Sequence, residues 1–158
     1  PKTPKPQNLE TNSKPTNSLT YLIFAHFLRS FINLKIKTKY MDSGTKIVVV
    51  GGGGQAGKIH VTNLKKFGAI VGNCDFMANA DCDDNFIGKI PYTEPFSKGY
   101  KVAIVALPDR MCFAHCKDMI EAGFERILVE KPGCKNVEEL QELVAIAEKK
   151  GVTFYINY

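Results

Sequence analysis

The sequence predicts an α/β fold, a doubly wound parallel sheet, and three observations support this prediction. From Lys46 onward, stretches typical of strands alternate with stretches typical of helices. Two of the strand-like stretches, 47–50 and 102–106, are apolar without a polar break, as in strands that are buried on both faces. A run of four glycines, 51–54, separates the first strand from the first helix. Because such alternating units bury both faces of a parallel sheet, we expect helices on both sides of it.

The pattern places most of the elements in order along the chain. We expect about six strands, five of them at 47–50, 69–75, 102–106, 127–129 and 152–156, and helices at 55–67, 110–122 and 136–150. The segment 77–97 is harder to interpret, and we expect a short strand in it near Ile90. The last helix has the clearest ends. Asn136 can cap its first turn, Glu139 can reach back to the cap backbone, and Gly151 can end it.

The first 40 residues differ in composition from the rest of the chain. Residues 1–40 hold seven Lys or Arg against one Glu, a net charge of +6, whereas residues 41–158 hold fourteen against fifteen acidic residues, a net of −1. We therefore expect 1–40 to be a disordered or extraneous extension and 41–158 to be a single domain. A targeting peptide is the alternative for the extension, whose apolar stretch 19–36 is interrupted and too short to span a membrane. Because the basic excess lies outside the domain, we expect neither a nucleic-acid partner nor a membrane partner.

The cysteines and the acidic residues do not predict a metal site. The five cysteines are odd in number and include no C-x-x-C pair. Cys112 and Cys116 can share a helix face, but two thiols do not complete a zinc site. The acidic cluster 81–84 lacks the glycine and terminal glutamate of a calcium-binding loop, so we expect a solvated turn. The sequence thus favours reduced thiols in a cytoplasmic protein without a bound metal.

The glycine run continues into a dinucleotide-binding motif. Residues 52–57 fit G-x-G-x-x-G directly after a strand and at the start of a helix. In the motif, Gly52 allows a tight turn, Gly54 allows the pyrophosphate to approach the backbone, and Gly57 allows the helix to pack closely on the strand. A register shifted to start at Gly51 and a glycine-rich turn without a ligand are the alternatives. We expect a Rossmann fold that binds a dinucleotide.

The start of this helix is the expected phosphate site. There the N–H groups of residues such as Gln55 and Ala56 have no partner within the helix and can face the phosphates. A phosphate loop of the Walker type requires Gly-Lys followed by Ser or Thr, but Gly57 and Lys58 are followed by Ile59. The sequence therefore favours a dinucleotide over a nucleoside triphosphate.

Asp75 indicates which dinucleotide is preferred. It lies about 20 residues after the glycine motif, at the end of the second strand, where an acidic residue meets the adenosine ribose hydroxyls. The alternative is an ordinary aspartate at a strand end. A carboxylate there repels a 2′-phosphate, and the next residues, Phe76 and Met77, supply no cation. We expect NAD rather than NADP.

Residues 47–158 resemble the N-terminal domain of the glucose–fructose oxidoreductase and inositol dehydrogenase family, Gfo/Idh/MocA. The resemblance rests on signals in the same order along the chain. The glycine motif extends to His60, residues 105–109 are similar to the family's strand ending in Thr-Pro-Asn, and residues 127–132 read Ile-Leu-Val-Glu-Lys-Pro.

The resemblance implies an NAD(P)-dependent oxidoreductase that transfers hydride between a nicotinamide cofactor and a sugar, polyol or related hydroxy substrate. It implies that Leu107 and Pro108 line the cofactor site and that Glu130 and Lys131 lie beside the nicotinamide ribose. Lys131 would be catalytic, because its ammonium would lie near the reacting carbinol and favour its deprotonation. His60 is expected to pack or to brace a loop, and His115 to lie on a helix surface.

The sequence departs from the family at Asp109, where the family usually has Asn, and at Cys112, where it usually has His. The family's proton-transfer histidine lies in a second domain, which we expect to be absent from this chain. We therefore expect the chain alone to be inactive, and any homo-oligomer to form through the missing domain. A non-catalytic module that binds or senses the dinucleotide and an inactive truncated product are the alternatives.

Overall fold

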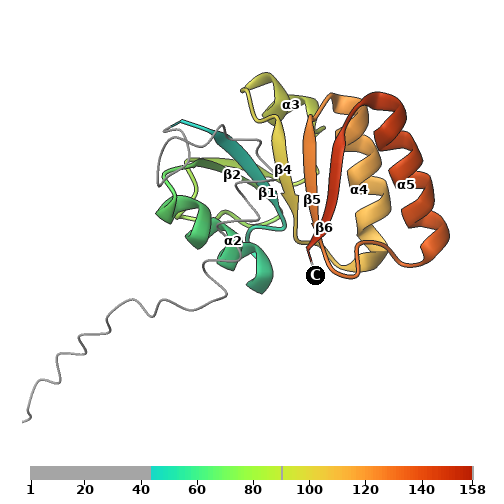
Figure 1. Cartoon of the computed structure of the whole chain (residues 1–158). Coiled ribbons are helices and arrows are strands. Elements are labelled where there is room, and N and C mark those ends of the chain that lie inside the picture. The colour runs from blue at the N-terminus through green and yellow to red at the C-terminus, as the bar shows by residue number, and fades with distance from the viewer. Residues whose placement is uncertain (1–43, 90, 158) are drawn as a thin grey trace, which may run out of the picture.

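Six parallel strands form one sheet in a computed structural model that describes residues 44–89 and 91–157 of the chain (Figure 1). The strands are β1 (Lys46–Val50), β2 (Ile70–Asp75), β3 (Asp84–Ile87), β4 (Val102–Val105), β5 (Arg126–Glu130) and β6 (Thr153–Asn157). Their order is β3-β2-β1-β4-β5-β6, and every neighbouring pair is parallel. The chain thus winds outward from β1 in both directions, which confirms the predicted doubly wound sheet and is the strand order of a Rossmann fold.

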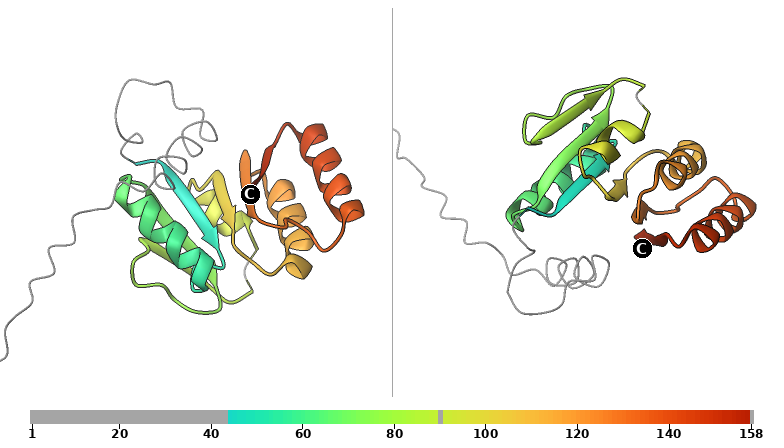
Figure 2. Two further views of the ribbon diagram at one scale, coloured as in Figure 1. Left: turned by 60° about the horizontal axis from the view of Figure 1, so that its bottom comes forward. Right: turned by 90° about the horizontal axis from the view of Figure 1, so that it is seen from above.

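Helices cover both faces of this sheet (Figure 2). The helices are α2 (Gln55–Lys66), α3 (Thr93–Ser97), α4 (Asp109–Ala122) and α5 (Val137–Lys150). Alternate residues of β1 show the two layers. Ile47 and Val49 pack with apolar residues of α2 on one face, whereas Val48 and Val50 pack with residues of α4 and α5 on the other. No helix in the described part of the chain has the length and apolar character needed to cross a membrane.

The prediction for the segment between β2 and β4 was wrong in its position. The short strand is β3, at residues 84–87, whereas Ile90 lies outside the described residues. Phe86 is the only buried residue of β3, so the strand has almost no apolar pattern, and its pairing with β2 defines it. The expected extension at residues 1–40 also lies outside the described residues.

The acidic cluster before β3 is not simply a solvated turn. Asp83 accepts hydrogen bonds from Lys65 Nζ and from the backbone N–H of Val71, and Asp84 accepts one from the Tyr100 hydroxyl. These bonds, to Lys65 and to Tyr100 first of all, hold the pKa of both carboxyl groups below the ordinary value. The cluster therefore fastens β3 to its neighbours.

The ends of α5 and α4 follow the predicted chemistry with one difference. Asn136 Oδ1 accepts a hydrogen bond from Glu139 N at 2.8 Å, as in an N-cap. The Glu139 carboxylate bonds to Lys135 N, one residue before the expected cap backbone. Gly123 and Gly151 end α4 and α5 with φ of 99° and 70°, values that favour glycine.

Candidate functional site

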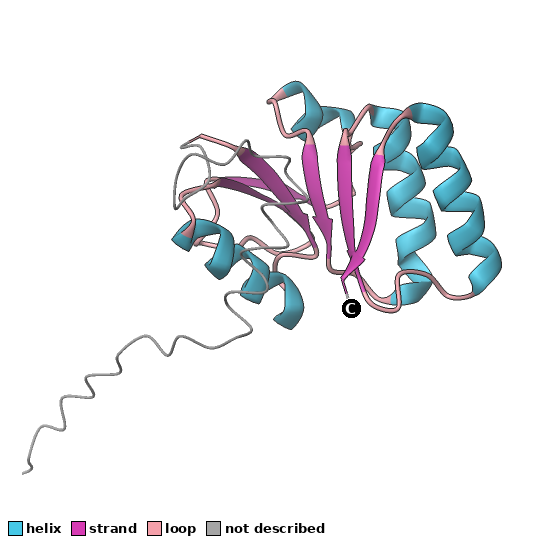
Figure 3. Ribbon diagram, viewed as in Figure 1, coloured by secondary structure: helices cyan, strands magenta, loops and turns pink. Residues whose placement is uncertain are grey.

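The predicted site residues lie on the loops that follow the carboxyl ends of the strands. These loops gather along one edge of the sheet, the lower edge in Figure 3. The strand order reverses at β1, which pairs with β2 on one side and β4 on the other. In open α/β sheets, ligands bind outside the carboxyl ends at such a reversal. The glycine run 51–54 begins at this point.

Three glycines of the run and motif are required by the fold itself. Gly51 has φ of 85°, and a side chain there would collide with the Ala106 carbonyl at the end of β4. At Gly52 a side chain would collide with Asn73 Oδ1 in β2, and at Gly57 with the backbone of Gly51. Gly57 thus allows the close packing of α2 on β1 that the motif predicted.

Gly54 is different, because the fold does not require it to be glycine. Its φ is −74° and its ψ 169°, a conformation that any residue adopts. An added Cβ would have only one neighbour within 4 Å, the carbonyl oxygen of Gly51 at 3.3 Å. Gly54 is also exposed. The space above it is therefore open to a molecule that approaches the backbone.

The start of α2 offers backbone donors at the same place. Gly54 is the N-cap, no side chain caps the helix, and its first turn holds no acidic residue. Gln55 and Ala56 are both exposed. The N–H groups of a first helical turn carry partial positive charge and attract anions. The structure thus brings together Gly52, Gly54, Gln55, Ala56 and Gly57 in an arrangement that suits a phosphate.

The Asp75 carboxylate, at the end of β2, lies beside this loop. Its Oδ2 accepts a hydrogen bond from Gly53 N at 2.8 Å. Its Oδ1 accepts one from Phe76 N at 2.6 Å and a longer one from Met77 N at 3.4 Å. The side chains of Phe76 and Met77 are 74% and 61% exposed. Asp75 therefore fills a position surrounded by backbone N–H groups, next to two exposed apolar side chains.

The end of β4 supplies the next loop. Leu107 is half-buried and packs against the core, and Pro108 is the exposed N-cap of α4. The buried Cys112 thiol donates to the carbonyls of both residues at 3.5 Å. Burial raises the pKa of Cys112 to about 11, so it is a neutral thiol that holds this loop. Asp109 is exposed and accepts a hydrogen bond from Arg110 N.

Glu130, at the end of β5, links three elements of the same edge. Its Oε1 accepts a hydrogen bond from His60 Nε2 of α2 at 2.5 Å and one from Asn157 Nδ2 of β6 at 2.8 Å. His60 is buried, in agreement with the bracing role expected for it. The contact joins the helix that starts at the glycine loop to the far half of the sheet.

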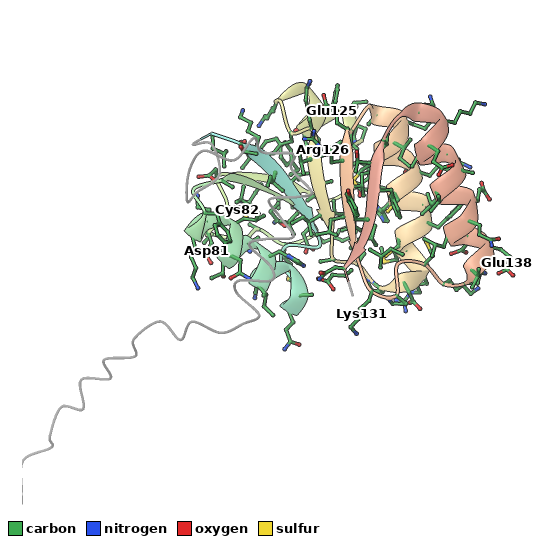
Figure 4. The ribbon with its side chains drawn as sticks, in the orientation of Figure 1. Asp81, Cys82, Glu125, Arg126, Lys131 and Glu138 are labelled. Carbon is green, nitrogen blue, oxygen red and sulfur yellow. The ribbon has the colours of Figure 1, made fainter. Side chains whose placement is uncertain are left out.

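Lys131 follows directly at the lower edge of the sheet (Figure 4). It is exposed and is in none of the ion pairs among the described residues. Its peptide bond to Pro132 is cis. The structure brings Lys131 to the same edge as the glycine loop, with its ammonium in solvent.

Sequence reasoning missed a group of three asparagines, one in β2, one in β3 and one in the connection between them. Asn73 and Asn79 are buried, and Asn79 Nδ2 donates to the carbonyl of Gly52 at 2.8 Å. Asn85 of β3 bonds to both of the other two. The available signal was Asn73, a polar residue inside an otherwise apolar strand.

Comparison with protein families gives one match over most of the chain. The model of the oxidoreductase family with an NAD-binding Rossmann fold, GFO_IDH_MocA, matches residues 45–158. A comparison with curated proteins found no match.

Solved structures share the fold at low sequence identity. An oxidoreductase from Bacillus cereus is 23% identical with a TM-score of 0.59, over 71% of this chain and 34% of that one. The WlbA dehydrogenase from Chromobacterium violaceum, solved in complex with NADH and UDP-GlcNAcA, is 19% identical with a TM-score of 0.61, over 78% and 38%. The scyllo-inositol dehydrogenase from Lactobacillus casei is 17% identical with a TM-score of 0.59, over 74% and 37%. The chain thus spans little more than a third of the length of these structures.

Proposed function

The chain belongs to the Gfo/Idh/MocA oxidoreductase family, and we propose on that basis that its described domain holds NAD at the glycine loop for a dehydrogenase reaction. The Gly54 position carries this proposal. The fold excludes a side chain at Gly51, Gly52 and Gly57 but gives less reason for glycine at Gly54, where an added Cβ would meet only the Gly51 carbonyl oxygen, at 3.3 Å. A bound pyrophosphate supplies the reason, because it needs to approach the backbone at that position.

The residues around Gly54 suit the rest of the cofactor. The N–H groups at the start of α2, at Gln55 and Ala56, would hold the pyrophosphate. Asp75 would accept hydrogen bonds from the adenosine ribose, and its charge would repel the 2′-phosphate of NADP. Leu107 and Pro108 would line the middle of the site. This arrangement supports NAD over NADP.

We assign the hydride transfer to the part of this edge that follows β5, where Lys131 lies. When bound, NAD accepts a hydride at its nicotinamide. The exposed ammonium of Lys131 would orient a substrate hydroxyl and stabilise the negative charge that grows on its oxygen. His60 and Asn157 would fix Glu130, the residue before Lys131, at the end of β5. We assign the substrate to the class of sugars, polyols and related hydroxy compounds, a class consistent with the names of the structural neighbours.

Turnover would require a substrate-binding domain in addition to the residues matched here, because the neighbours are much longer than the matched region. Association between copies would also involve that domain. The free thiols of all five cysteines support a reducing compartment, the cytoplasm. A module that binds or senses the dinucleotide without catalysis is the second candidate, favoured by Asp109, whose carboxylate at the start of α4 would add negative charge near the cofactor.

Titration with NADH tests the proposal. The protein should bind NADH, and Gly54→Val should abolish binding while the variant still folds, because at Gly54 an added Cβ has one neighbour within 4 Å, the Gly51 carbonyl oxygen at 3.3 Å. Thr62→Val is the matched control, since it introduces the same side chain at an exposed position of the same helix. Cofactor binding is measured by NADH fluorescence and folding by circular dichroism. Failure of the unmodified protein to bind NADH, or normal binding by Gly54→Val, would contradict the proposal.

A further inference from the structure

The peptide group between Gly52 and Gly53 is held at both of its ends. Its carbonyl accepts a hydrogen bond from Asn79 Nδ2 at 2.8 Å. Its N–H donates to Asp75 Oδ2, also at 2.8 Å. Both glycines are buried in the structure. Two side chains from outside the glycine loop thus fix the orientation of this one peptide plane.

Asn79 is itself held in place by other asparagines. Its backbone N–H donates to Asn85 Oδ1, and its carbonyl accepts from Asn85 Nδ2. Asn85 Oδ1 also accepts from Asn73 Nδ2, which donates in addition to the Met77 carbonyl. Asn79 Oδ1 accepts from Asp81 N at 3.0 Å, so both ends of its amide are bound. The connection between β2 and β3 is therefore folded so that the Asn79 side chain points at the glycine loop.

A glycine–glycine peptide needs such a support more than any other. Glycine adopts positive and negative φ almost equally well, so a peptide between two glycines can turn over with little steric cost. Turning this peptide would break the bonds to Asn79 and to Asp75 together, and would leave buried polar groups without partners. The bonds thus select one orientation of the loop before any ligand arrives.

We propose that Asn79 is a positioning residue that, together with Asp75, preorganises the Gly52–Gly53 peptide for pyrophosphate binding. This inference rests on the proposed function. The orientation of this peptide sets the path of the backbone into Gly54 and the first N–H groups of α2. Loss of the Asn79 bond would let the loop populate other orientations. The apparent affinity for NAD would then fall in proportion to the fraction of molecules that keep the orientation competent to bind.

Binding by variants tests the inference. Asn79→Ala should weaken NADH binding about tenfold, the factor that one hydrogen bond is worth. Asn79→Asp should weaken it at least as much at neutral pH, because it keeps the size of the side chain and the acceptor for Asp81 N but points an oxygen at the Gly52 carbonyl. Asn136→Ala is the control. Like Asn79→Ala it removes an asparagine side chain that is hydrogen-bonded to the backbone, but at the start of α5, where Asn136 accepts from Glu139 N. It should lower thermal stability and leave NADH affinity within about twofold.

Amide hydrogen exchange, measured by NMR on the unliganded full chain, gives a readout that does not depend on NADH binding. Gly53 N–H should already be protected without cofactor, and Asn79→Ala should speed its exchange about tenfold while a core amide such as that of Val48 is unchanged. Gly53 exchange as fast as in an exposed loop would overturn the inference, as would NADH affinity of Asn79→Ala within twofold of the unmodified protein. If the unmodified protein does not bind NADH, the proposed function fails, while a protected Gly53 amide would still support the preorganised loop.

Discussion

At the scale of single residues, the Asp75 carboxylate has both a structural role and a proposed role in cofactor choice. It accepts hydrogen bonds from the backbone N–H groups of Gly53, Phe76 and Met77, and it places negative charge where the ribose of NAD is proposed to lie. A group of backbone N–H donors that converge on one point is an anion site. Asp75 therefore occupies with its own charge a position that a phosphate could otherwise take.

This arrangement predicts how cofactor preference changes at Asp75. The unmodified protein should bind NADH more tightly than NADPH. Asp75→Ala should narrow or reverse the difference, because it removes the repulsion, roughly 1 to 4 kcal/mol per unit charge at about 4 Å, and frees the N–H groups that the carboxylate fills. The measurement is a pair of fluorescence titrations, with Asp81→Ala as the matched exposed control. Tighter binding of NADPH by the unmodified protein would refute the assignment.

Substitution of Lys131 distinguishes a role in cofactor binding from a role in catalysis. If its ammonium acts on the substrate oxygen, Lys131→Ala should leave NADH affinity within a few fold, as should Lys149→Ala on the exposed face of α5. In a protein that combines this domain with a substrate-binding domain, Lys131→Ala should lower kcat by roughly a hundredfold, about 3 kcal/mol, as expected for one electrostatic donor. Turnover of that variant equal to the unmodified enzyme would show that Lys131 has a structural or cofactor-side role, and would favour the non-catalytic module.

Single residues also show where sequence reasoning ends. The motif glycines and Asp75 could be found because the backbone geometry of a strand, a tight turn and a helix requires them at fixed spacing. The bond from Asn79 to Gly52 could not, because it depends on how the connection between β2 and β3 folds back. The contact between His60 and Glu130 joins residues far apart in the chain and also depends on the final packing of α2.

At the scale of elements, a histidine of α4 contacts the residue that precedes α3. The Tyr92 hydroxyl and His115 Nδ1 form a hydrogen bond of 2.5 Å, and the two rings meet edge to face. The sequence suggested a surface histidine at His115, but the ring is half-buried. Burial lowers the pKa of His115 below its ordinary value of 6.5; nearby Lys89 also lowers it, and Asp118 opposes the shift.

The lowered pKa predicts a pH dependence of stability. In the window below pH 6.5, the unfolded chain binds a proton at His115 more readily than the folded protein does, so acidification favours unfolding. Stability should fall between pH 7.5 and 5.5 and should fall less in His115→Phe, which cannot titrate. The stabilisation from Asp83 and Asp84 stays in place over this pH range and is lost only at lower pH, because their pKa values are lowered from 3.8. Thermal melts at the two pH values measure the effect, and an equal decrease in both proteins would contradict it.

The elements themselves could be predicted to different degrees. β1 and β4 were clear because strands that are buried on both faces have continuous apolar sequences. The end of α5 was clear because caps and terminal glycines are local signals. β3 was placed wrongly because an edge strand with one buried residue, Phe86, has little sequence pattern of its own. Its position follows from pairing with β2, which is a tertiary effect.

At the scale of the whole molecule, the order of strands along the chain determines where the site lies. Alternating strands and helices allowed a parallel sheet to be predicted, and the sheet brings all the carboxyl-end loops to one edge. The glycine loop, Asp75 and Lys131 therefore lie on the same edge although they come from three different strands. We propose that NAD binds along this edge, centred on Gly54 and the start of α2.

Amide chemical-shift changes on addition of NAD⁺, recorded by NMR on the isotope-labelled chain, would locate the cofactor on the domain. Backbone amides report the contact residue by residue and need no substrate and no turnover. The largest shift changes should occur at residues 52–57 and at Asp75 and Phe76, and smaller ones at Leu107 and Lys131. The chemical shifts of amides at the opposite edge, near Lys101 and Glu125, should not change. Changes concentrated at that opposite edge, or no saturable changes with NAD⁺, would contradict NAD binding at the glycine loop.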